Sequence, residues 1–332
     1  MRLLLAGDPG DLTLTYVGWL AGRRGIEVAI LPEDRLGVDG WFGVDGRRTP
    51  PRIDLRLAGG ERLRGDELAG AFVRLHPEPA VPAELGLDEA EAPIFVQERR
   101  AGLQHLLRSL PGRVVNRPAA GRSNGSKPFQ MSRLAAAGFA VPEWLATNDA
   151  ERAQAFVGSW PDGAVLKACS GLRSHVRRAD GQLFASLRAG TAPVLLQRYI
   201  GGGEVRIHTV GDRTFATRIR TGALDYRFDG DDVAFEPAAA PEALAQRCVR
   251  FAAAEGLLLA GFDFRVTPSG EWWCLEMNPV PTFLPYEAGA GHPIGDAVLD
   301  LIAGKSTGVE VSPLARAMEA GSASEAAVAA SA

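Results

Sequence analysis

The chain is short of several residues and patterns that mark other classes of protein. Only three of its 36 basic residues are lysines, Lys127, Lys167 and Lys305, and arginine supplies the rest. A formal net charge of -4 argues against a surface built to neutralise nucleic-acid phosphates. No stretch approaches the roughly 20 apolar residues that a membrane span needs. We therefore expect neither nucleic acid nor a membrane as a partner.

Cysteine is also scarce, and its spacing excludes two structural uses. Cys169, Cys248 and Cys274 are odd in number and far apart, which fits neither a disulfide framework nor a zinc site. The apolar run at the start of the chain is too short for a secretory signal peptide. We therefore expect a reducing, cytoplasmic location. The chain does have an ordinary globular balance, with 332 residues, 46% hydrophobic and 23% charged, enough for about two domains.

The N-terminal third has the pattern of an open parallel sheet. Short apolar runs at 2–6 and 27–31 enclose a helical pattern at 12–25, and strand, turn, helix, strand begins an α/β unit. The turn lacks G-x-G-x-x-G, so no dinucleotide-binding fingerprint is assigned. Further elements are expected as a hairpin at 53–63, a strand at 71–75 and a helix at 92–110. The predicted fold class is α/β.

From residue 114 onward the chain becomes richer in strands, so the C-terminal half is predicted to be α+β. Helices are expected at 128–138, 150–158, 241–256 and 294–302, and strands at 164–167, 194–200, 204–210, 214–221, 262–267 and 272–277. We divide the chain into an N-terminal domain at 1–113, a second domain at 114–304 and a flexible alanine- and serine-rich tail at 305–332. The second domain is expected to have a small lid subdomain at about 125–200 and a large one at about 201–304.

Two of the lysines stand beside small residues. Lys127 follows 123–126, which is Ser-Asn-Gly-Ser, and Lys167 comes shortly before Ser170 and Gly171. A triphosphate needs compact cationic groups and loops thin enough for backbone N–H groups to approach its oxygens. Neither segment matches the Walker pattern, so each is a weak signal alone.

A third segment, 197–200, could read the edge of adenine, and Glu204 could accept hydrogen bonds from ribose hydroxyls. An edge strand followed by a glycine turn explains the same residues more simply.

The strongest signal is a set of three oxygen-bearing side chains, Asp263, Glu276 and Asn278. Residues i and i+2 on a strand point to the same face, so Glu276 and Asn278 project together. Asp263 lies on the preceding strand, which a turn at 267–270 pairs with theirs. Three such oxygens in apolar surroundings suit Mg²⁺, with phosphate oxygens and water completing the octahedron. The alternative is a solvated hairpin with chance acids.

Taken together, these residues resemble the ATP-grasp superfamily of carboxylate–amine ligases over roughly 114–302. Within that superfamily the chain is most similar to the branch of ribosomal-protein glutamate ligases (RimK-like) and microviridin-type macrocyclising ligases. The segments that carry the branch similarity are 115–118, 126–130, 141–142, 147–149 and 225–227. The resemblance implies an ATP-grasp fold preceded by an open parallel-sheet domain of Rossmann-like type.

The resemblance also implies a role for each site residue. Lys127 and Lys167 would hold the α- and β-phosphates of ATP, and the loop with Ser170 and Gly171 would close over the γ-phosphate. Adenine and ribose would be bound by Gln197, Arg198, Tyr199, Ile200 and Glu204. Two Mg²⁺ ions, for which Mn²⁺ could substitute, would be held by Asp263, Glu276 and Asn278. The candidates to stabilise the transferred phosphate and the oxyanion are Arg218, Arg220 and Arg227, although exposed strand arginines without a catalytic role are an equal alternative.

The function implied by this resemblance is an ATP-dependent ligase. It would activate a carboxylate as an acyl phosphate and join it to an amine, on a peptide or amino-acid substrate. Three alternatives stay open at this point: a kinase of the same fold that phosphorylates a small-molecule hydroxyl, a macrocyclase that forms an ester or lactone, and a non-catalytic binding module. Dimerisation is common in such ligases, which leaves a homodimer open.

Overall fold

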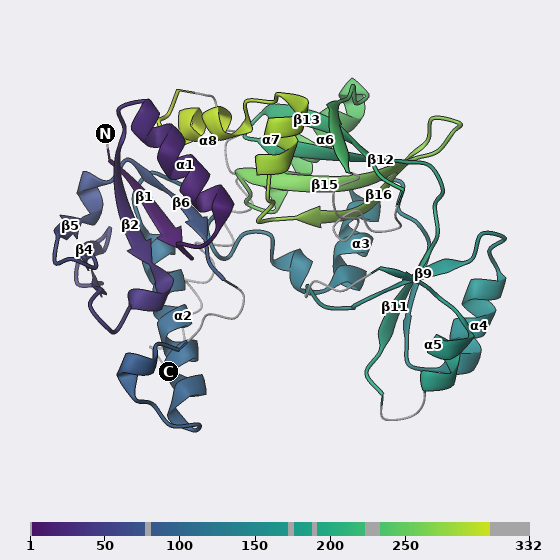
Figure 1. Ribbon diagram of the computed structural model, residues 1–332, viewed down its shortest axis with the longest axis horizontal. Coiled ribbons are helices and arrows are strands. Elements are labelled where there is room, and N and C mark those ends of the chain that lie inside the picture. Colours follow the sequence, from purple (N-terminus) through teal and green to yellow (C-terminus); the bar gives the residue numbers. More distant parts are fainter. Residues whose placement is uncertain (1, 77–80, 172–175, 188–190, 223–232, 306–332) are drawn as a thin grey trace.

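A computed structural model describes residues 2–76, 81–171, 176–187, 191–222 and 233–305 (Figure 1). The described chain forms four β-sheets. The N-terminal sheet has the order β2-β1-β6-β7, with strands β1 (Arg2–Gly7), β2 (Glu27–Pro32), β6 (Gly70–Arg74) and β7 (Arg113–Val115). All of its neighbouring pairs are parallel, which confirms the predicted open parallel sheet. The predicted domain boundary after residue 113 falls inside β7.

Helices cover both faces of this sheet. Helix α1 (Leu12–Arg23) packs on the face that carries Leu3 and Leu5, and α2 (Glu91–Ser109) packs on the opposite face with Leu4. Successive strand residues alternate between faces, so both faces of the buried β1 are apolar, as a parallel sheet requires. The side chain of Asp11 caps α1 by accepting hydrogen bonds from the backbone of the first turn.

A small antiparallel sheet adds to the hydrophobic core on the α2 face of the N-terminal sheet. Its strands are β3 (Trp41–Asp45), β4 (Arg52–Arg56) and β5 (Arg62–Arg64). Strands β4 and β5 form the predicted hairpin. Strand β3 pairs with β4 and was not predicted. Ile53, Leu55 and Leu63 are buried in the same cluster as α2.

The large sheet is antiparallel and has the order β14-β13-β12-β15-β16. Its strands are β12 (Gly203–Val210), β13 (Arg213–Arg220), β14 (Ala234–Pro237), β15 (Leu259–Val266) and β16 (Trp272–Asn278). On one face, α6 (Glu242–Ala254) and Leu134 of α3 (Lys127–Ala136) bury Ile207 and Phe262. The opposite face carries the polar residues that form the cavity described below.

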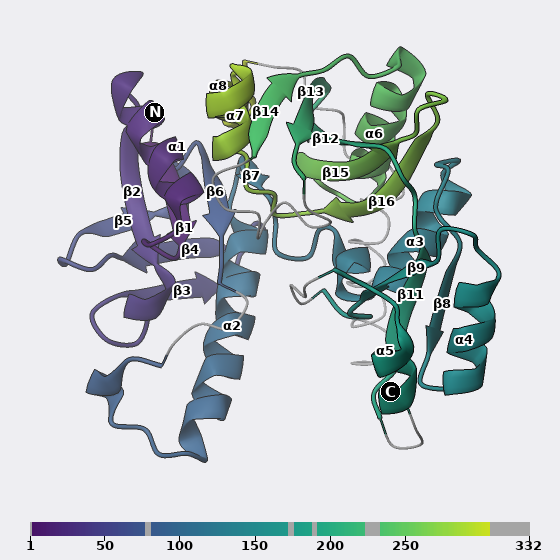
Figure 2. The same cartoon turned by 45° about the vertical axis from the view of Figure 1, so that its right-hand side comes forward.

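A fourth sheet, the lid sheet, stands apart from the N-terminal sheet in both views (Figures 1 and 2). It has the order β10-β9-β11-β8, with β8 (Trp144–Thr147), β9 (Ala164–Lys167), β10 (Arg177–Arg178) and β11 (Val194–Arg198). Helices α4 (Ala150–Gly158) and α5 (Gly181–Ser186) supply its small apolar core. The predicted bounds of the lid subdomain, about 125–200, stay a prediction.

Helix α8 (Ile294–Ile302) packs against both the N-terminal sheet and the large sheet. Its apolar residues share one core with Leu3 of the N-terminal sheet, with Val17 of α1 and with Leu259 of the large sheet. Arg113 adds a hydrogen bond to the carbonyl oxygen of Leu301 at 2.6 Å. The N-terminal and C-terminal parts are therefore held together by one continuous hydrophobic core.

The elements that the sequence did not predict are all short. They are β3, β7, β8, β10, β14, α5 and α7 (Leu284–Ala290), of two to seven residues each. Such segments are too short to show a clear hydrophobic period. In the part of the chain that the structure describes, none of the helices is both long and apolar enough to span a membrane.

Candidate active site

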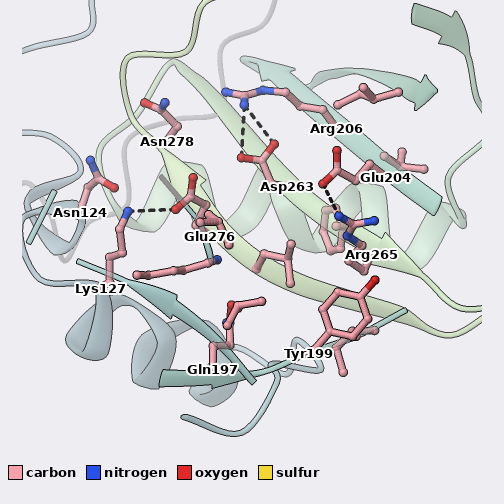
Figure 3. Close-up of a pocket in the computed structure, with 18 of the residues that line it drawn as sticks. Asn124, Lys127, Gln197, Tyr199, Glu204, Arg206, Asp263, Arg265, Glu276 and Asn278 are labelled. Carbon is pink, nitrogen blue, oxygen red and sulfur yellow. Dashed lines mark hydrogen bonds and ion pairs between the residues drawn. The ribbon is translucent and has the colours of Figure 1, made fainter. Parts of the chain in front are cut away.

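A cavity of about 310 Å³ lies between the lid sheet and the large sheet (Figure 3). The structure brings most of the predicted site residues to its wall: Lys127, Lys167, Gly171, Gln197, Arg198, Tyr199, Ile200, Glu204, Asp263, Glu276 and Asn278. These residues come from segments up to about 150 positions apart, as in the hydrogen bond between Lys127 and Glu276. Their convergence is therefore a property of the fold.

The two lysines enter this cavity from neighbouring segments. Lys127 is the first residue of α3, and Lys167 is the last residue of β9. The backbone N–H of Lys127 donates to the carbonyl oxygen of Cys169 at 2.8 Å, and Ser126 pairs with Ser170 as a β-bridge. These contacts hold the start of α3 against the small-residue loop after β9. Ser170 itself is not among the residues that line the cavity.

The paired strands β15 and β16 carry the three predicted metal ligands. Asp263 lies directly opposite Glu276, and Gly261 lies opposite Asn278. All three side chains face the cavity, while Phe262 and Met277 point into the core on the other face. The alternating pattern that the sequence predicted for this hairpin is therefore present in the structure.

Two cations already lie beside these carboxylates. The Lys127 Nζ atom is 3.0 Å from a carboxylate oxygen of Glu276, and a guanidinium nitrogen of Arg206 is 3.0 and 3.2 Å from the two oxygens of Asp263 (Figure 3). The chemistry of the donor set, two carboxylates and one amide oxygen, suits a hard cation such as Mg²⁺. Among the described residues no group of three His, Cys, Asp or Glu side chains forms a metal site, so further ligands would have to come from substrate and water.

The segment between β11 and β12 forms another wall. Gln197 is buried, and its amide nitrogen lies 3.9 Å from the sulfur of Met131. The backbone N–H of Tyr199 donates to the carbonyl oxygen of Gly163 at 3.1 Å, and the Arg178 guanidinium stacks on the Tyr199 ring. The backbone N–H of Tyr199 is therefore already paired within the protein.

Glu204 and Arg265 form an ion pair in the wall opposite the lysines. The distance between their charged atoms is 2.8 Å, and both side chains are mostly buried. Glu204 lies opposite Arg265 in the β12–β15 pairing, so the pair is fixed by strand register.

The predicted catalytic arginines lie elsewhere. Arg218 and Arg220 are exposed and alternate along β13 with Ile219, which lines the cavity. They therefore point to the other face of the sheet, and Arg220 pairs there with Glu236 at 2.7 Å. The structure does not bring either residue to the cavity. Arg227 lies outside the described residues.

Among the described residues, the arginines that line the cavity are Arg198, Arg206 and Arg265. Sequence reasoning gave Arg206 and Arg265 no role. The sequence did contain an indication that Arg206 lies in the site. It follows Glu204 by two residues on a strand, so both side chains lie on the same face. The pairing of Arg206 with Asp263 could not be known without the strand register.

Sequence reasoning also missed a buried glutamine that lies behind the predicted metal ligands. The side-chain amide of Gln130 accepts a hydrogen bond from the backbone N–H of Met277 at 3.0 Å and donates one to its carbonyl oxygen at 2.8 Å. Met277 stands between Glu276 and Asn278. Gln130 therefore ties α3, which begins with Lys127, to the strand that carries two of the predicted metal ligands.

A buried histidine supports the far end of the cavity. His208 is fully buried, and its ring packs edge-on against Tyr286, which lines the cavity, at 4.8 Å between centroids. Burial, together with the nearby charge of Arg206, lowers the pKa of His208 well below its ordinary value. This shift favours the uncharged ring, whose Nε2 atom lies 3.4 Å from the carbonyl oxygen of Thr282.

The arrangement of the four sheets and of this cavity is the ATP-grasp fold, as solved structures of similar proteins show. The chain is similar to the ATP-grasp ligase PsnB complexed with a minimal precursor, with 25% identity, a TM-score of 0.76, and coverage of 91% of this chain and 98% of that one. The macrocyclase MdnC from Microcystis aeruginosa MRC, bound with precursor peptide MdnA, matches with 19% identity, a TM-score of 0.78, and coverage of 92% and 100%.

A third similar structure is a RiPP-associated ATP-grasp ligase from Chryseobacterium gregarium, solved with ADP and a leader and core peptide. It has 19% identity, a TM-score of 0.79, and coverage of 92% of this chain and 98% of that one. No protein-family model matches the chain, and no curated protein matches its sequence. The predicted resemblance to ATP-grasp ligases of the RimK-like and microviridin type is confirmed, and the chain has the fold of an ATP-grasp ligase.

Proposed function

We propose that this protein is an ATP-dependent ligase that activates a carboxylate of a peptide as an acyl phosphate and joins it to an amine. The observation that carries the proposal is the single cavity in which Lys127 and Lys167 face Asp263, Glu276 and Asn278. Cationic groups on one side and a hard-cation donor set on the other are what a triphosphate with Mg²⁺ requires.

The reaction has two balanced steps. A carboxylate oxygen of the substrate bonds to the γ-phosphorus of ATP, and the bond from that phosphorus to the oxygen of ADP breaks. An amine nitrogen then bonds to the acyl carbon, inorganic phosphate leaves and the amine loses a proton. Positioning and charge stabilisation supply most of the catalysis in such a transfer.

The residues of the cavity divide this work. Lys127 and Lys167 would bind phosphate oxygens, the segment around Gln197 and Tyr199 would receive adenine, and Glu204 the ribose. Asp263, Glu276 and Asn278 would hold Mg²⁺, which when bound neutralises charge on the phosphoryl oxygens. Arg206, already beside Asp263, would add a fixed positive charge at the same end of the cavity.

A peptide substrate is supported by the similar structures. PsnB was solved with its minimal precursor, Mg and ADP, at 24% identity to this chain, and MdnC was solved with a precursor peptide. An amine is the proposed nucleophile, and a hydroxyl that gives an ester is the related outcome that product analysis distinguishes.

The direct test is a screen for ADP release in the presence of Mg²⁺ across acidic peptides and free amino acids, with mass spectrometry of the products. A ligase releases free phosphate and its product has lost one water for each bond formed. Lys167→Ala is expected to lower substrate-dependent ADP release by about 10²–10³-fold, the usual effect of losing one charge contact to the transition state. Lys305→Ala is the matched control, because Lys305 is exposed and is not among the residues that line the cavity.

Two outcomes would contradict the proposal. A product that has gained a phosphoryl group, with no free phosphate, would identify a kinase. Absence of Mg-ATP binding by calorimetry would identify a non-catalytic module. Equal activity of the Lys167→Ala and Lys305→Ala variants would remove the assigned role of Lys167.

A further inference from the structure

The segment that leaves strand β16, which we name the metal-strand exit, consists of residues 279–282. It follows directly after Asn278 and runs along two cavities. Thr282 lines the main cavity, whereas Pro279 and Val280 line a smaller one beside α2. The Val280 backbone N–H donates to the side-chain oxygen of Asn278 at 2.9 Å. The backbone position of residues 279–282 therefore helps to set the orientation of the Asn278 amide.

An arginine of the N-terminal sheet holds this exit. Arg74, the last residue of β6, donates to the carbonyl oxygen of Pro281 at 2.9 Å and to the hydroxyl of Thr282 at 3.3 Å. Its side chain is only 8% exposed. The Nε atom of Arg74 also contacts a carboxylate oxygen of Asp11 at 2.7 Å, while the other oxygen of Asp11 caps α1. Asp11 thus fixes the direction in which Arg74 reaches.

An asparagine of the connection after β7 holds the other end of the exit. The amide nitrogen of Asn116 donates to the carbonyl oxygens of Pro279 and Leu259, both at 2.6 Å. Its amide oxygen accepts from the backbone N–H groups of Leu258 and Leu259 at 2.9 and 3.0 Å. The Asn116 side chain therefore makes four hydrogen bonds and ties the start of β15, the strand of Asp263, to the end of β16.

We propose that Arg74 and Asn116 are positioning residues that set the metal affinity of the site from outside it. The inference rests on the proposed function, since it takes Asp263, Glu276 and Asn278 as the Mg²⁺ ligands. Neither residue lines the main cavity, so neither contacts the metal. They act through the backbone that leaves and enters the ligand strands. Partners of this kind, one step behind the ligands, usually change metal affinity by about 10–100-fold when they are removed.

The chain offers a matched control at the same interface between its N-terminal and C-terminal parts. Arg113 lies on β7, next to β6 in the sheet, and donates to a backbone carbonyl oxygen, that of Leu301 on α8. It ties the same two parts of the chain together as Arg74 does, but it does not touch the metal-strand exit. If both arginines only stabilise the fold, substituting either one should have the same effect on metal binding. If Arg74 is a positioning residue, only the substitution of Arg74 should weaken metal binding.

The test measures metal binding directly on the full-length protein. Mn²⁺ is titrated in the presence of ADP, and free Mn²⁺ is followed by electron paramagnetic resonance. We expect Arg74→Met to weaken Mn²⁺ binding by about 10-fold or more. Arg74→Lys, which keeps the charge but loses the planar fork, should fall between Arg74→Met and the wild type. Arg113→Met should bind Mn²⁺ as the wild type does, even where its melting temperature falls as much as that of Arg74→Met.

Asn116→Asp is the second variant, because it replaces the donating amide nitrogen by an oxygen that faces two carbonyl groups. It should also weaken Mn²⁺ binding. If Arg74→Met, Arg74→Lys and any folded Asn116→Asp protein bind Mn²⁺ like the wild type, the positioning role is wrong while the proposed function stands. If the wild type itself binds no Mn²⁺ with ADP, both the proposed function and this inference are overturned.

Discussion

At the scale of single residues, strand register determines which of two arginines, Arg206 or Arg218, faces the cavity. Val205 and Arg218 lie opposite each other in the β12–β13 pairing. Arg206, the next residue on β12, therefore points to the opposite face from Arg218. Arg206 is buried beside Asp263, whereas Arg218 is exposed. An arginine side chain thus lies in the cavity wall on one face of the sheet and in solvent on the other.

Substituting Arg206 and Arg218 in turn tests which of the two arginines contributes to catalysis. We expect Arg206→Met to lower substrate-dependent ADP release by about 10²–10³-fold, because a fixed charge at the transferred phosphoryl group would be lost. Arg218→Met should leave ADP release unchanged. Steady-state ADP release and circular dichroism, the latter to confirm folding, measure both variants. A larger loss in Arg218→Met than in Arg206→Met would return the catalytic role to the arginine that the sequence favoured.

At the scale of elements, helix α3 and strand β16 act as one unit. Lys127 begins the helix and contacts Glu276, and one turn later Gln130 makes two hydrogen bonds to the backbone of Met277. Gln130 is almost fully buried. The helix therefore carries one phosphate-binding candidate and fixes the strand that carries two metal-binding candidates.

Removing the Gln130 amide should loosen this unit. Gln130→Ala leaves the backbone N–H and carbonyl groups of Met277 without that buried partner, so we expect it to lower the free energy of unfolding by about 1–3 kcal/mol. Urea denaturation measures the change. Gln246→Ala is the control, because Gln246 is exposed on α6 and its side chain donates a hydrogen bond to Glu242 of the same helix. Surface substitutions usually change the free energy of unfolding by no more than about 0.5 kcal/mol. Equal stability of the two variants would show that the Gln130 contacts contribute nothing.

At the scale of the whole molecule, the N-terminal and C-terminal parts share a core. Helix α8 buries Val298 and Leu301 together with Leu3 and Val17. Arg24 adds ion pairs to Asp296 and Asp300 at the rim. The large sheet, which forms one wall of the cavity, therefore shares a core with the N-terminal sheet, and Arg74 contacts the metal-strand exit across this junction.

This shared core predicts one unfolding transition. Leu301→Ala should lower the free energy of unfolding by about 2–5 kcal/mol through the cavity that it creates. Its tryptophan-fluorescence and circular-dichroism transitions should remain coincident, because the core spans both parts. Leu12→Ala is the matched control, because the Leu12 side chain is 73% exposed and its loss should change little. Two separated transitions in the wild type or in Leu301→Ala would contradict a common core.

The sequence by itself determined the fold class and the types of group in the site. Its periodicities are local, so they marked most of the longer helices and strands. Lys127, Lys167 and the Asp263, Glu276 and Asn278 set could be named because their residue types suit phosphate and Mg²⁺ whatever surrounds them. Elements such as β3 and β8 were not predicted, because four or five residues define a hydrophobic period only weakly, although β4 and β9, of the same lengths, were recognised.

Only the tertiary structure decided which charges face the cavity and what holds them there. The register of β12 against β15 places Arg206, and not Arg218, beside Asp263. Arg74 and Asn116 contact the metal-strand exit across large distances in the chain, with separations of 207 positions to Pro281 and 163 positions to Pro279. Pairing register and long-range hydrogen bonds depend on how whole elements pack, and no local pattern of side chains encodes them.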